Sequence, residues 1–201
     1  MSCLVPKDNI KTNSKIFVIG DLHADYIKTI ELLKYFDLID VNNRWKGKNN
    51  IVVQLGDQID GYGRGVYEDA SGEIDILNLF DRLHLEALQY GGGIYSIIGN
   101  HELMNVMGNF SYASKNDIEN QGGEDSRRKQ YAPGGSLAKR LACTRNTIIK
   151  INDIIFVHGG IIPDLIKKER KNVIKLINGL MRSYFRGEID DEHPEFKKFL
   201  N

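Results

Sequence analysis

The fold of this chain is decided by the stretch Ile51-Val52-Val53-Gln54-Leu55-Gly56-Asp57-Gln58-Ile59-Asp60. Its apolar, β-branched run predicts a buried strand, and the run ends abruptly at Gly56-Asp57. In α/β folds the ends of such strands carry the functional site, so we interpret Asp57 as a carboxylate shared by two metal ions. Taken alone, Asp57 would more often be a helix cap or a turn residue, but the other motifs of the chain favour the metal.

Three further strand candidates also end in polar motifs. Asp21 and His23 lie two residues apart, so in an extended segment both side chains point the same way. A carboxylate and an imidazole together suit a divalent metal ion, and so does the amide oxygen of Asn100. Each motif is weak by itself, but four such strand ends in one chain are very unlikely by chance. The three motifs are Gly20-Asp21-Leu22-His23 after 15–19, Gly99-Asn100-His101-Glu102 after 94–98, and His158-Gly159-Gly160 after 154–157.

The remaining periodicity predicts helices between the strands. Apolar residues recur at helical spacing over 26–36 and 74–90, and the first of these helices joins two strands that should be parallel neighbours. Asn152-Asp153, between two apolar runs, predicts a hairpin. We expect residues 111–132, which are polar and irregular, to form a mobile insertion near the site entrance, and residues 164–186 to form a basic amphipathic helix.

Composition favours one α/β domain. The chain has 201 residues, 41% of them hydrophobic, which is enough for a real core. Its 27 Lys and Arg balance its 27 Asp and Glu, so we expect no nucleic-acid and no membrane partner. Cys3 and Cys143 lie far apart, and neither has a partner at metal-ligand spacing, which predicts a reducing compartment and no disulfide framework. Since the N-terminus has no apolar signal core, the expected location is the cytoplasm.

The four motifs in this order, Gly-Asp-x-His, Gly-Asp-x-x-Asp, Gly-Asn-His-Glu and His-Gly-Gly, resemble those of the calcineurin-like metallophosphoesterases. Within that group the chain is similar to the phosphoprotein phosphatases, and above all to the Shewanella-like protein phosphatases. The segments that carry the closer likeness are 45–60, 99–108, 133–142 and 156–163. The likeness covers residues 15–186 and implies a β-sandwich flanked by helices. Outside it, the polar composition of residues 1–14 predicts a loose N-terminal arm, and residues 187–201, which show no core pattern, are expected to form a polar tail.

The resemblance implies a role for each motif residue. Two divalent ions, manganese, iron or zinc, would be held by five ligands: Asp21 and His23 at the first ion, Asp57 between both, and Asn100 and His158 at the second. His101 would be the general acid that protonates the leaving oxygen, and Asp60 would hold its imidazole in place. Asn100 would also bind the substrate phosphate. A bridging hydroxide would be the nucleophile, so no nucleophilic Ser or Cys is needed.

Two departures from the family pattern matter. The family has Arg directly after the position of Asp60, where this chain has Gly61, so we assign the phosphate contact to Arg64. The family's last metal histidine lies in a later Gly-His-Thr segment, which this sequence lacks, and His193 sits in the polar tail and is not expected to bind metal. We therefore expect only the N-terminal sheet and its helices, in a domain incomplete at its C-terminus, with a partner chain supplying the second sheet.

The predicted function is that of a metal-dependent phosphoester hydrolase of the protein serine/threonine or tyrosine phosphatase type. Its substrate would be a phosphoprotein or a small phosphoester. Two alternatives stay open. One is a dinucleoside-tetraphosphate hydrolase, because related enzymes share these motifs. The other is a truncated remnant that is inactive or that a partner completes.

Overall fold

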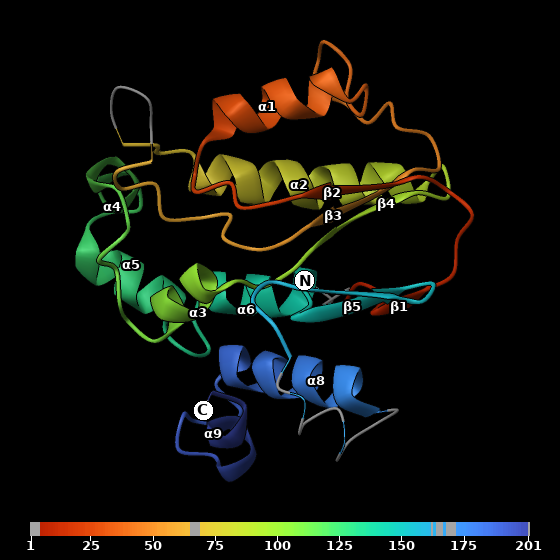
Figure 1. The fold of residues 1–201 in the computed structure, drawn as a ribbon. Coiled ribbons are helices and arrows are strands. Elements are labelled where there is room, and N and C mark those ends of the chain that lie inside the picture. Colours follow the sequence, from red (N-terminus) through yellow and green to blue (C-terminus); the bar gives the residue numbers. More distant parts are fainter. Residues whose placement is uncertain (1–4, 65–68, 162, 164–166, 168–171, 201) are drawn as a thin grey trace.

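The computed structural model describes residues 5–64, 69–161, 163, 167 and 172–200, and it contains two small β-sheets stacked between layers of helices (Figure 1). The first sheet has three parallel strands, in the order β2 (Ile16–Ile19), β3 (Ile51–Gln54) and β4 (Gly93–Ser96). Its register pairs Ile16 with Ile51, and Ile51 with Gly93. All three strands therefore end at the same edge of the sheet.

Helices α1 (Tyr26–Tyr35) and α2 (Glu73–Leu88) cover the outer face of the first sheet (Figure 1). The predicted helices at 26–36 and 74–90 are thereby confirmed. Asp25 begins α1, because its side chain accepts the amide of Lys28 at 2.9 Å. Fully buried apolar side chains of both helices form one core with the sheet. That core includes Leu33 of α1, Val52 of β3, and Phe80 and Leu83 of α2.

The second sheet is built from the predicted hairpin, β5 (Ile148–Ile151) and β6 (Ile154–Val157), with the short strand β1 (Asn9–Ile10) parallel to β5. The α/β class is confirmed, but the expectation of a single sheet and of a wholly loose arm at 1–14 needs correction. The physical reason is apolar burial between the sheets, where Ile149 and Ile151 pack against Val53 and Tyr95.

Helix α8 (Val173–Arg186) packs on the other side of the second sheet, where Val173 and Ile177 contact Ile148 (Figure 1). Part of the helix predicted over 164–186 lies outside the described residues. The tail expected to be polar contains α9 (Pro194–Leu200), which packs against α8. The ring of Phe196 is buried and stacks on Tyr184 with 4.4 Å between centroids, so this aromatic pair attaches the tail to the domain.

Four helices connect the two sheets: α3 (Asn100–Val106), α4 (Lys115–Asn120), α5 (Glu124–Tyr131) and α6 (Ser136–Thr144). The interpretation of residues 111–132 as an irregular insertion is wrong, because α4 and α5 lie within it. Although this segment is polar in composition, the side chains of Arg127 and Tyr131 in it are fully buried. Tyr131 packs in the same core as Leu137 of α6 and Phe185 of α8, and these contacts hold the segment in place.

Cys143 on α6 is disulfide-bonded, whereas the sequence led us to expect no disulfide. The other cysteine of the chain, Cys3, lies outside the described residues. The N-terminal segment does return to this part of the fold, because Asn146 donates to the carbonyl of Pro6 at 3.3 Å. In the described ranges, no helix is both long enough and apolar enough to cross a bilayer.

Candidate metal centre

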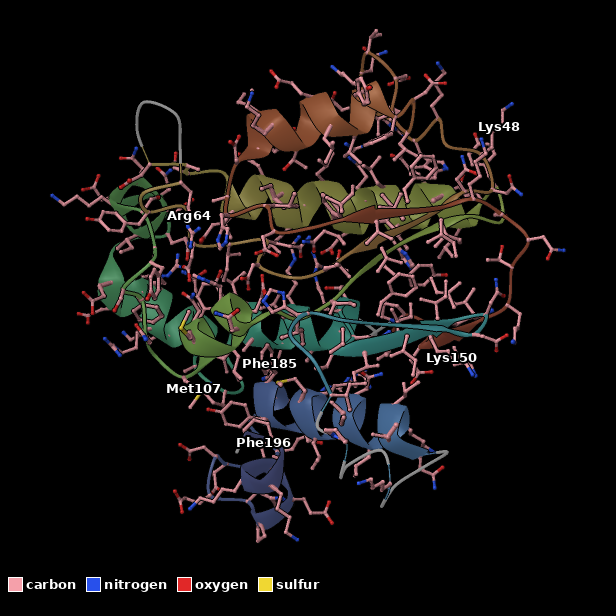
Figure 2. All side chains as sticks on the ribbon, in the orientation of Figure 1. Lys48, Arg64, Met107, Lys150, Phe185 and Phe196 are labelled. Carbon is pink, nitrogen blue, oxygen red and sulfur yellow. The ribbon has the colours of Figure 1, made fainter. Side chains whose placement is uncertain are left out.

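The predicted ligands come from the loops that follow β2, β3 and β4, and from the residue after β6. Because the first three strands are parallel neighbours, their loops meet at one edge of the first sheet. Strand β6 ends beside that edge, so Nε2 of His158 lies 3.3 Å from Oδ2 of Asp57. Figure 2 shows Arg64 at the end of the molecule where α4 and α5 lie. The structure thus brings residues from four separate strand ends to one place.

Left-handed backbone conformations aim these loops. Asp57 and Asp60 have φ angles of 53° and 67°, and His23 has 44°. Such conformations cost about 1–2 kcal/mol for a non-glycine residue, so neighbouring contacts must hold them. The amides of Leu22 and His23 both donate to the carbonyl of Asp57, at 3.0 and 2.9 Å. A Cβ on Gly99 would lie 2.2 Å from Oδ1 of Asp57, which is why that position needs glycine.

Glu102 ties the loops after β3 and β4 together. Its fully buried carboxylate accepts the amides of Asp57 at 3.0 Å, Gln58 at 2.8 Å and Gly99 at 2.7 Å. Burial, followed by the charge of Asp57, raises the pKa of Glu102, while the three amide donors favour its ionised form. Glu102 therefore holds the backbone of Asp57 in place.

Three imidazoles converge on one carboxylate oxygen. The distances from Oδ2 of Asp57 are 3.3 Å to Nε2 of His158, 3.9 Å to Nε2 of His101 and 4.0 Å to Nε2 of His23. The Asp57 side chain is only 5% exposed. Two ligands bound to one ion at about 2.0–2.2 Å lie roughly 3–3.5 Å apart, so these separations are near those of a metal shell.

The other ring nitrogen of each histidine has a fixed partner. Nδ1 of His158 donates to the carbonyl of Leu55 at 2.6 Å, and Nδ1 of His23 donates to the carbonyl of Asp60 at 3.2 Å. Nδ1 of His101 instead donates to the Asp60 carboxylate at 2.9 Å. Hydrogen bonds at Nδ1 leave Nε2 free to face the site, the arrangement that ligating histidines commonly show.

Asp21 and Asn100 complete the donor set. Oδ2 of Asp21 lies 3.8 Å from Nε2 of His23, and Oδ1 of Asn100 lies 2.8 Å from Nε2 of His158. Ligand atoms within 4.8 Å of one another form two groups that share Asp57. These groups are His23, Asp57 and His101, and Asp21, Asp57 and His158. The sequence paired Asp21 with His23, whereas in the structure Asp21 approaches both His23 and His158.

Electrostatics in the site favour positive charge beside Asp57. A hydrogen bond to the Asp57 carboxylate raises the pKa of His158 to about 9. The pKa of His101 is also raised: burial lowers it, but the hydrogen bond to the Asp60 carboxylate, together with the nearby negative charges, outweighs burial. Burial, and after it the charge of Arg64, lowers the pKa of His23. A proton on Nε2 of His158 takes the place that a cation would take, so the carboxylate, imidazole and amide donors fit a borderline divalent ion.

Gly61 and Arg64 explain the departure from the family pattern. A Cβ on Gly61 would lie 1.9 Å from the carbonyl oxygen of Ala70, so the backbone beside it excludes an arginine at that position. The amide of Ala70 donates to the Gly61 carbonyl at 3.0 Å, and this hydrogen bond holds the two ends of the loop together. Arg64 is exposed, and its charge reaches His23. The structure thus leaves one arginine of this loop beside the site.

Sequence reasoning missed three buried residues behind Asp60. Asn105 and Arg127 donate to the Asp60 carboxylate at 2.8 and 3.2 Å, and Arg127 also contacts Glu73. Asn105 follows His101 by four residues, so it lies on the same helical face and could have been found from that spacing. Nothing in the sequence marked Glu73 or Arg127, which are far apart along the chain.

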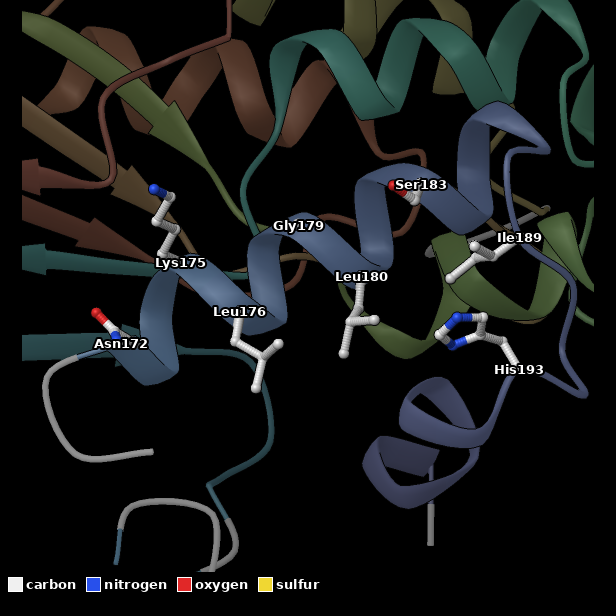
Figure 3. Close-up of a pocket in the computed structure, with 8 residues that line it drawn as sticks. All are labelled: Asn172, Lys175, Leu176, Gly179, Leu180, Ser183, Ile189 and His193. Atoms are coloured by element: carbon white, nitrogen blue, oxygen red, sulfur yellow. The ribbon is translucent and has the colours of Figure 1, made fainter. Parts of the chain in front are cut away.

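His193 does not approach the site. It lines a separate groove of about 560 Å³ along α8, together with Leu176, Leu180 and Ile189 (Figure 3). This groove is lined by none of the predicted ligands.

Comparison with known protein families gives a match over most of the chain. The profile of the calcineurin-like phosphoesterase family matches residues 14–200. Shewanella-like protein phosphatase 1 of Plasmodium berghei (strain Anka) is 38% identical over 157 residues, which are 77% of this chain and 41% of that protein. Shewanella-like protein phosphatase 2 of Arabidopsis thaliana is 28% identical over 215 residues, 86% of this chain and 53% of that protein.

Solved structures give the same picture. A mutant cold-active protein tyrosine phosphatase superposes with a TM-score of 0.77 at 27% identity, over 90% of this chain and 52% of that chain. The cold-active protein-tyrosine phosphatase of a psychrophilic Shewanella species superposes with a TM-score of 0.73 at 26% identity, with the same coverage. The chain therefore spans about half the length of the relatives it matches.

Proposed function

This chain belongs to the calcineurin-like phosphoesterase family, as its motifs predicted, and from this premise we propose that it hydrolyses phosphate monoesters with a pair of divalent cations. The ions, manganese, iron or zinc, would be held by Asp21, His23, Asp57, Asn100 and His158. Bound there, they would supply Lewis-acid stabilisation of the phosphoryl oxygens and ease the deprotonation of water.

One observation carries this proposal: three oriented imidazoles face a single buried carboxylate oxygen, Oδ2 of Asp57, at 3.3–4.0 Å. A buried carboxylate normally finds a fixed cation or several amide donors. Oδ1 of Asp57 accepts the backbone amide of His101 at 3.0 Å, whereas Oδ2 faces three imidazoles, which can give up a proton when a metal binds. The place of Asp57 between the two ligand groups supports a carboxylate that is shared by two ions.

His101 is proposed as the general acid that protonates the leaving oxygen. Its Nδ1 is committed to Asp60, and its Nε2 faces the site. The raised pKa of His101 favours the protonated form that a general acid needs. Positioned acids of this kind contribute roughly 10²–10⁴ in rate. Asp60 acts through the imidazole, and Asn100 and Arg64 are proposed to bind the substrate phosphate.

The proposed substrate is a phosphoprotein, dephosphorylated at serine, threonine or tyrosine, or a small phosphoester. Support comes from the relatives, which are named as protein phosphatases and a protein tyrosine phosphatase. The exposed Tyr112 borders the site, because its ring meets His101 edge-on at 5.1 Å. The exposed Tyr62 lies next to it, since its amide donates to the Tyr112 carbonyl at 3.0 Å. Such rings offer contact area to a peptide or an aryl group.

The test is phosphatase activity of the purified chain with and without manganese. With p-nitrophenyl phosphate we expect turnover that depends on the metal, and Asp57→Asn should reduce it by about 10³-fold or more. Asp153→Asn is the matched control, because Asp153 is 93% exposed in the β5–β6 turn. Metal-independent turnover, or full activity in Asp57→Asn, would overturn the proposal.

Two alternatives are outcomes of the same experiment. Faster cleavage of a dinucleoside tetraphosphate than of any phosphopeptide would favour a nucleotide hydrolase. Manganese binding in a calorimeter without turnover of any ester would favour a remnant.

The second sheet bears on the partner expectation. Within the described ranges β6 pairs only with β5, and its Ile154 and Ile155 side chains are 55% and 44% exposed. We propose that further strands from a partner chain extend the sheet at this edge. The expected result is a dimer or larger assembly in analytical ultracentrifugation that Ile155→Lys disperses, and a monomeric wild type would contradict it.

A cytoplasmic location stays part of the proposal. That location was inferred partly from cysteines expected to be reduced, whereas Cys143 is disulfide-bonded in the structure. A free-thiol titration of the purified protein tests which state is present.

A further inference from the structure

A fully buried arginine lies directly behind the proposed acid. Arg127 of α5 is 0% exposed, and its guanidinium lies over the rings of Tyr131 at 4.8 Å and Phe110 at 5.5 Å. These rings fix the plane of the guanidinium, because a cation prefers the faces of aromatic rings. A buried charge held so firmly is either a structural ion pair or a part of the site behind it.

The guanidinium divides its donors between two carboxylates and one amide. Nη1 and Nη2 contact the Glu73 carboxylate, and Nη2 also donates to Oδ1 of Asp60 at 3.2 Å. Nε and Nη2 donate to the side-chain oxygen of Asn105, at 3.0 and 2.6 Å. A simple ion pair would need Glu73 alone, so the contacts to Asp60 and Asn105 are additional.

Those additional contacts end at His101. Oδ2 of Asp60 accepts Nδ1 of His101 at 2.9 Å and Nδ2 of Asn105 at 2.8 Å, while Oδ1 accepts Arg127. Both oxygens of Asp60 are thus held from outside the site. Asn105 in turn donates to the backbone carbonyl of His101 at 3.0 Å. All of these hydrogen bonds join buried groups, which have little freedom to move.

We propose that Arg127 is a positioning residue for the His101–Asp60 pair, acting through Asp60 and Asn105 to keep Nε2 of His101 aimed at the leaving oxygen. This inference rests on the proposed function, in which His101 is the acid. A displacement of about 1 Å at a reacting group can cost 10²-fold in rate, so a residue that fixes an acid from behind can matter without touching substrate.

Leaving-group dependence separates positioning from simple stability. An acid matters for an ester whose leaving oxygen is a poor anion, such as phenyl phosphate, and little for dinitrophenyl phosphate, whose leaving group needs no proton. Arg127→Met should lower kcat about 10- to 100-fold for phenyl phosphate and less than about 3-fold for dinitrophenyl phosphate, with KM unchanged. Equal losses for both esters, or no loss for either, would overturn the proposal.

Matched variants guard against misfolding. Arg128→Met is the control: Arg128 is the next residue on α5, its side chain is 53% exposed, and it should leave both rates unchanged. Because Arg127→Met leaves Glu73 without its cation, the double variant Arg127→Met with Glu73→Gln is measured beside it and should show the same selective loss. Arg127→Lys should restore part of the phenyl phosphate rate, since one ammonium group can reach Asp60 but cannot span all three partners.

A readout without turnover keeps this inference separate from the proposed function. The experiment is proton NMR of protein labelled with nitrogen-15 histidine. The Nδ1 proton of His101, which is hydrogen-bonded to Asp60, should give a low-field resonance, and its absence in His101→Gln assigns it. We expect that resonance in the wild type and Arg128→Met, and its loss in Arg127→Met and in the double variant. If it persists there, the proposal about Arg127 fails. If the wild type shows the resonance but no metal-dependent turnover, the proposed function fails and the resonance alone decides the role of Arg127.

Discussion

Two groups of polar and charged side chains meet at the loop after β3, and their charges are compensated in different ways. The ligand cluster consists of the five proposed ligands Asp21, His23, Asp57, Asn100 and His158, with the proposed acid His101 beside them. The arginine cluster consists of Asp60, Glu73, Asn105 and Arg127. The ligand cluster is open to solvent on one side, where the Asp21 side chain is 49% exposed. In the arginine cluster the side chains of Asp60, Glu73 and Arg127 are 0% exposed.

The difference lies in where the positive charge comes from. The arginine cluster contains a permanent cation, since a guanidinium keeps its proton at any working pH. The ligand cluster has only protons on imidazoles, and protons can be exchanged for metal ions. A closed cluster with its own cation is suited to hold geometry, and an open cluster without one is suited to bind a cation.

We expect the largest effect from a change at Glu102. Its carboxylate is compensated by three backbone amides, and those amides fix the loop that both clusters share. Glu102→Gln replaces one acceptor oxygen by an NH₂ group that faces an N–H donor. We expect a loss of roughly 3 kcal/mol in the free energy of unfolding, the usual cost of buried unsatisfied donors. Urea denaturation measures it, with the exposed Glu119→Gln on α4 as control.

The same variant should lose at least about 100-fold in metal-dependent kcat, because Asp57 would no longer be held in its left-handed conformation. A Glu102→Gln protein as stable and active as Glu119→Gln would show that the amide contacts do not position the ligand cluster.

Metal addition should stabilise the chain through the ligand cluster alone. At a manganese concentration of 100 times Kd, binding to the folded state adds about 2.7 kcal/mol to the free energy of unfolding. For a chain of this size that raises Tm by roughly 5–10 °C. Asp57→Asn should abolish the shift, and Asp153→Asn should keep it. An equal shift in Asp57→Asn, seen by differential scanning fluorimetry, would place the bound metal elsewhere.

Asp117 tests the arginine cluster by pH. It lies on α4, where Ser114 donates to its carboxylate at 3.0 Å, and it faces Glu73 of α2 and Arg127 of α5. Burial, followed by the charge of Glu73, raises the pKa of Asp117 from 3.8 to about 7. Between these values the folded state binds more protons than the unfolded state. The free energy of unfolding therefore falls as pH rises from about 4 to about 7.

Asp117→Asn should remove this fall. The pKa difference of about 3 units sets an upper bound of about 4 kcal/mol, because each unit corresponds to about 1.4 kcal/mol, so the free energy of unfolding at pH 8 should rise by roughly 2–4 kcal/mol. Urea denaturation at pH 5 and pH 8 measures the slope. Asp125→Asn, an exposed change in the first turn of α5, should behave as the wild type does. Parallel pH profiles in wild type and Asp117→Asn would mean that the negative charge of Asp117 is already balanced within the arginine cluster.

The contrast between the clusters also explains what sequence could predict. Residues of the ligand cluster directly follow β-branched runs, and parallel strands bring such ends to one edge. Both facts can be read from the sequence, and so could the helices that cover the first sheet. The pairing of Asp21 with both histidines could not, because it depends on how far β6 of the second sheet reaches.

The arginine cluster could not be predicted for a different reason. A charged residue in a polar stretch is normally solvated, and Arg127 is buried only because partners 54 and 67 residues away supply its acceptors. Similarly, β1 has two residues, too few for a pattern, and it exists because β5 offers it a parallel edge. Sequence motifs located the groups that we propose to bind metal and substrate, whereas the groups that support them could be found only from the structure.

We expect the smallest effect from a change at Arg64. Its substitution tests whether this arginine supplies a permanent positive charge beside the ligand cluster. Arg64 is exposed, so a phosphate contact there is screened by water and worth about 1 kcal/mol. Arg64→Ala should therefore raise KM for p-nitrophenyl phosphate about 5-fold with kcat nearly unchanged, the pattern of lost ground-state binding. Arg64→Lys should retain most of the affinity, because the charge remains. Arg128→Ala is the surface control, and a KM for Arg64→Ala equal to that of the control would assign the phosphate contact to the metal ions and Asn100 alone.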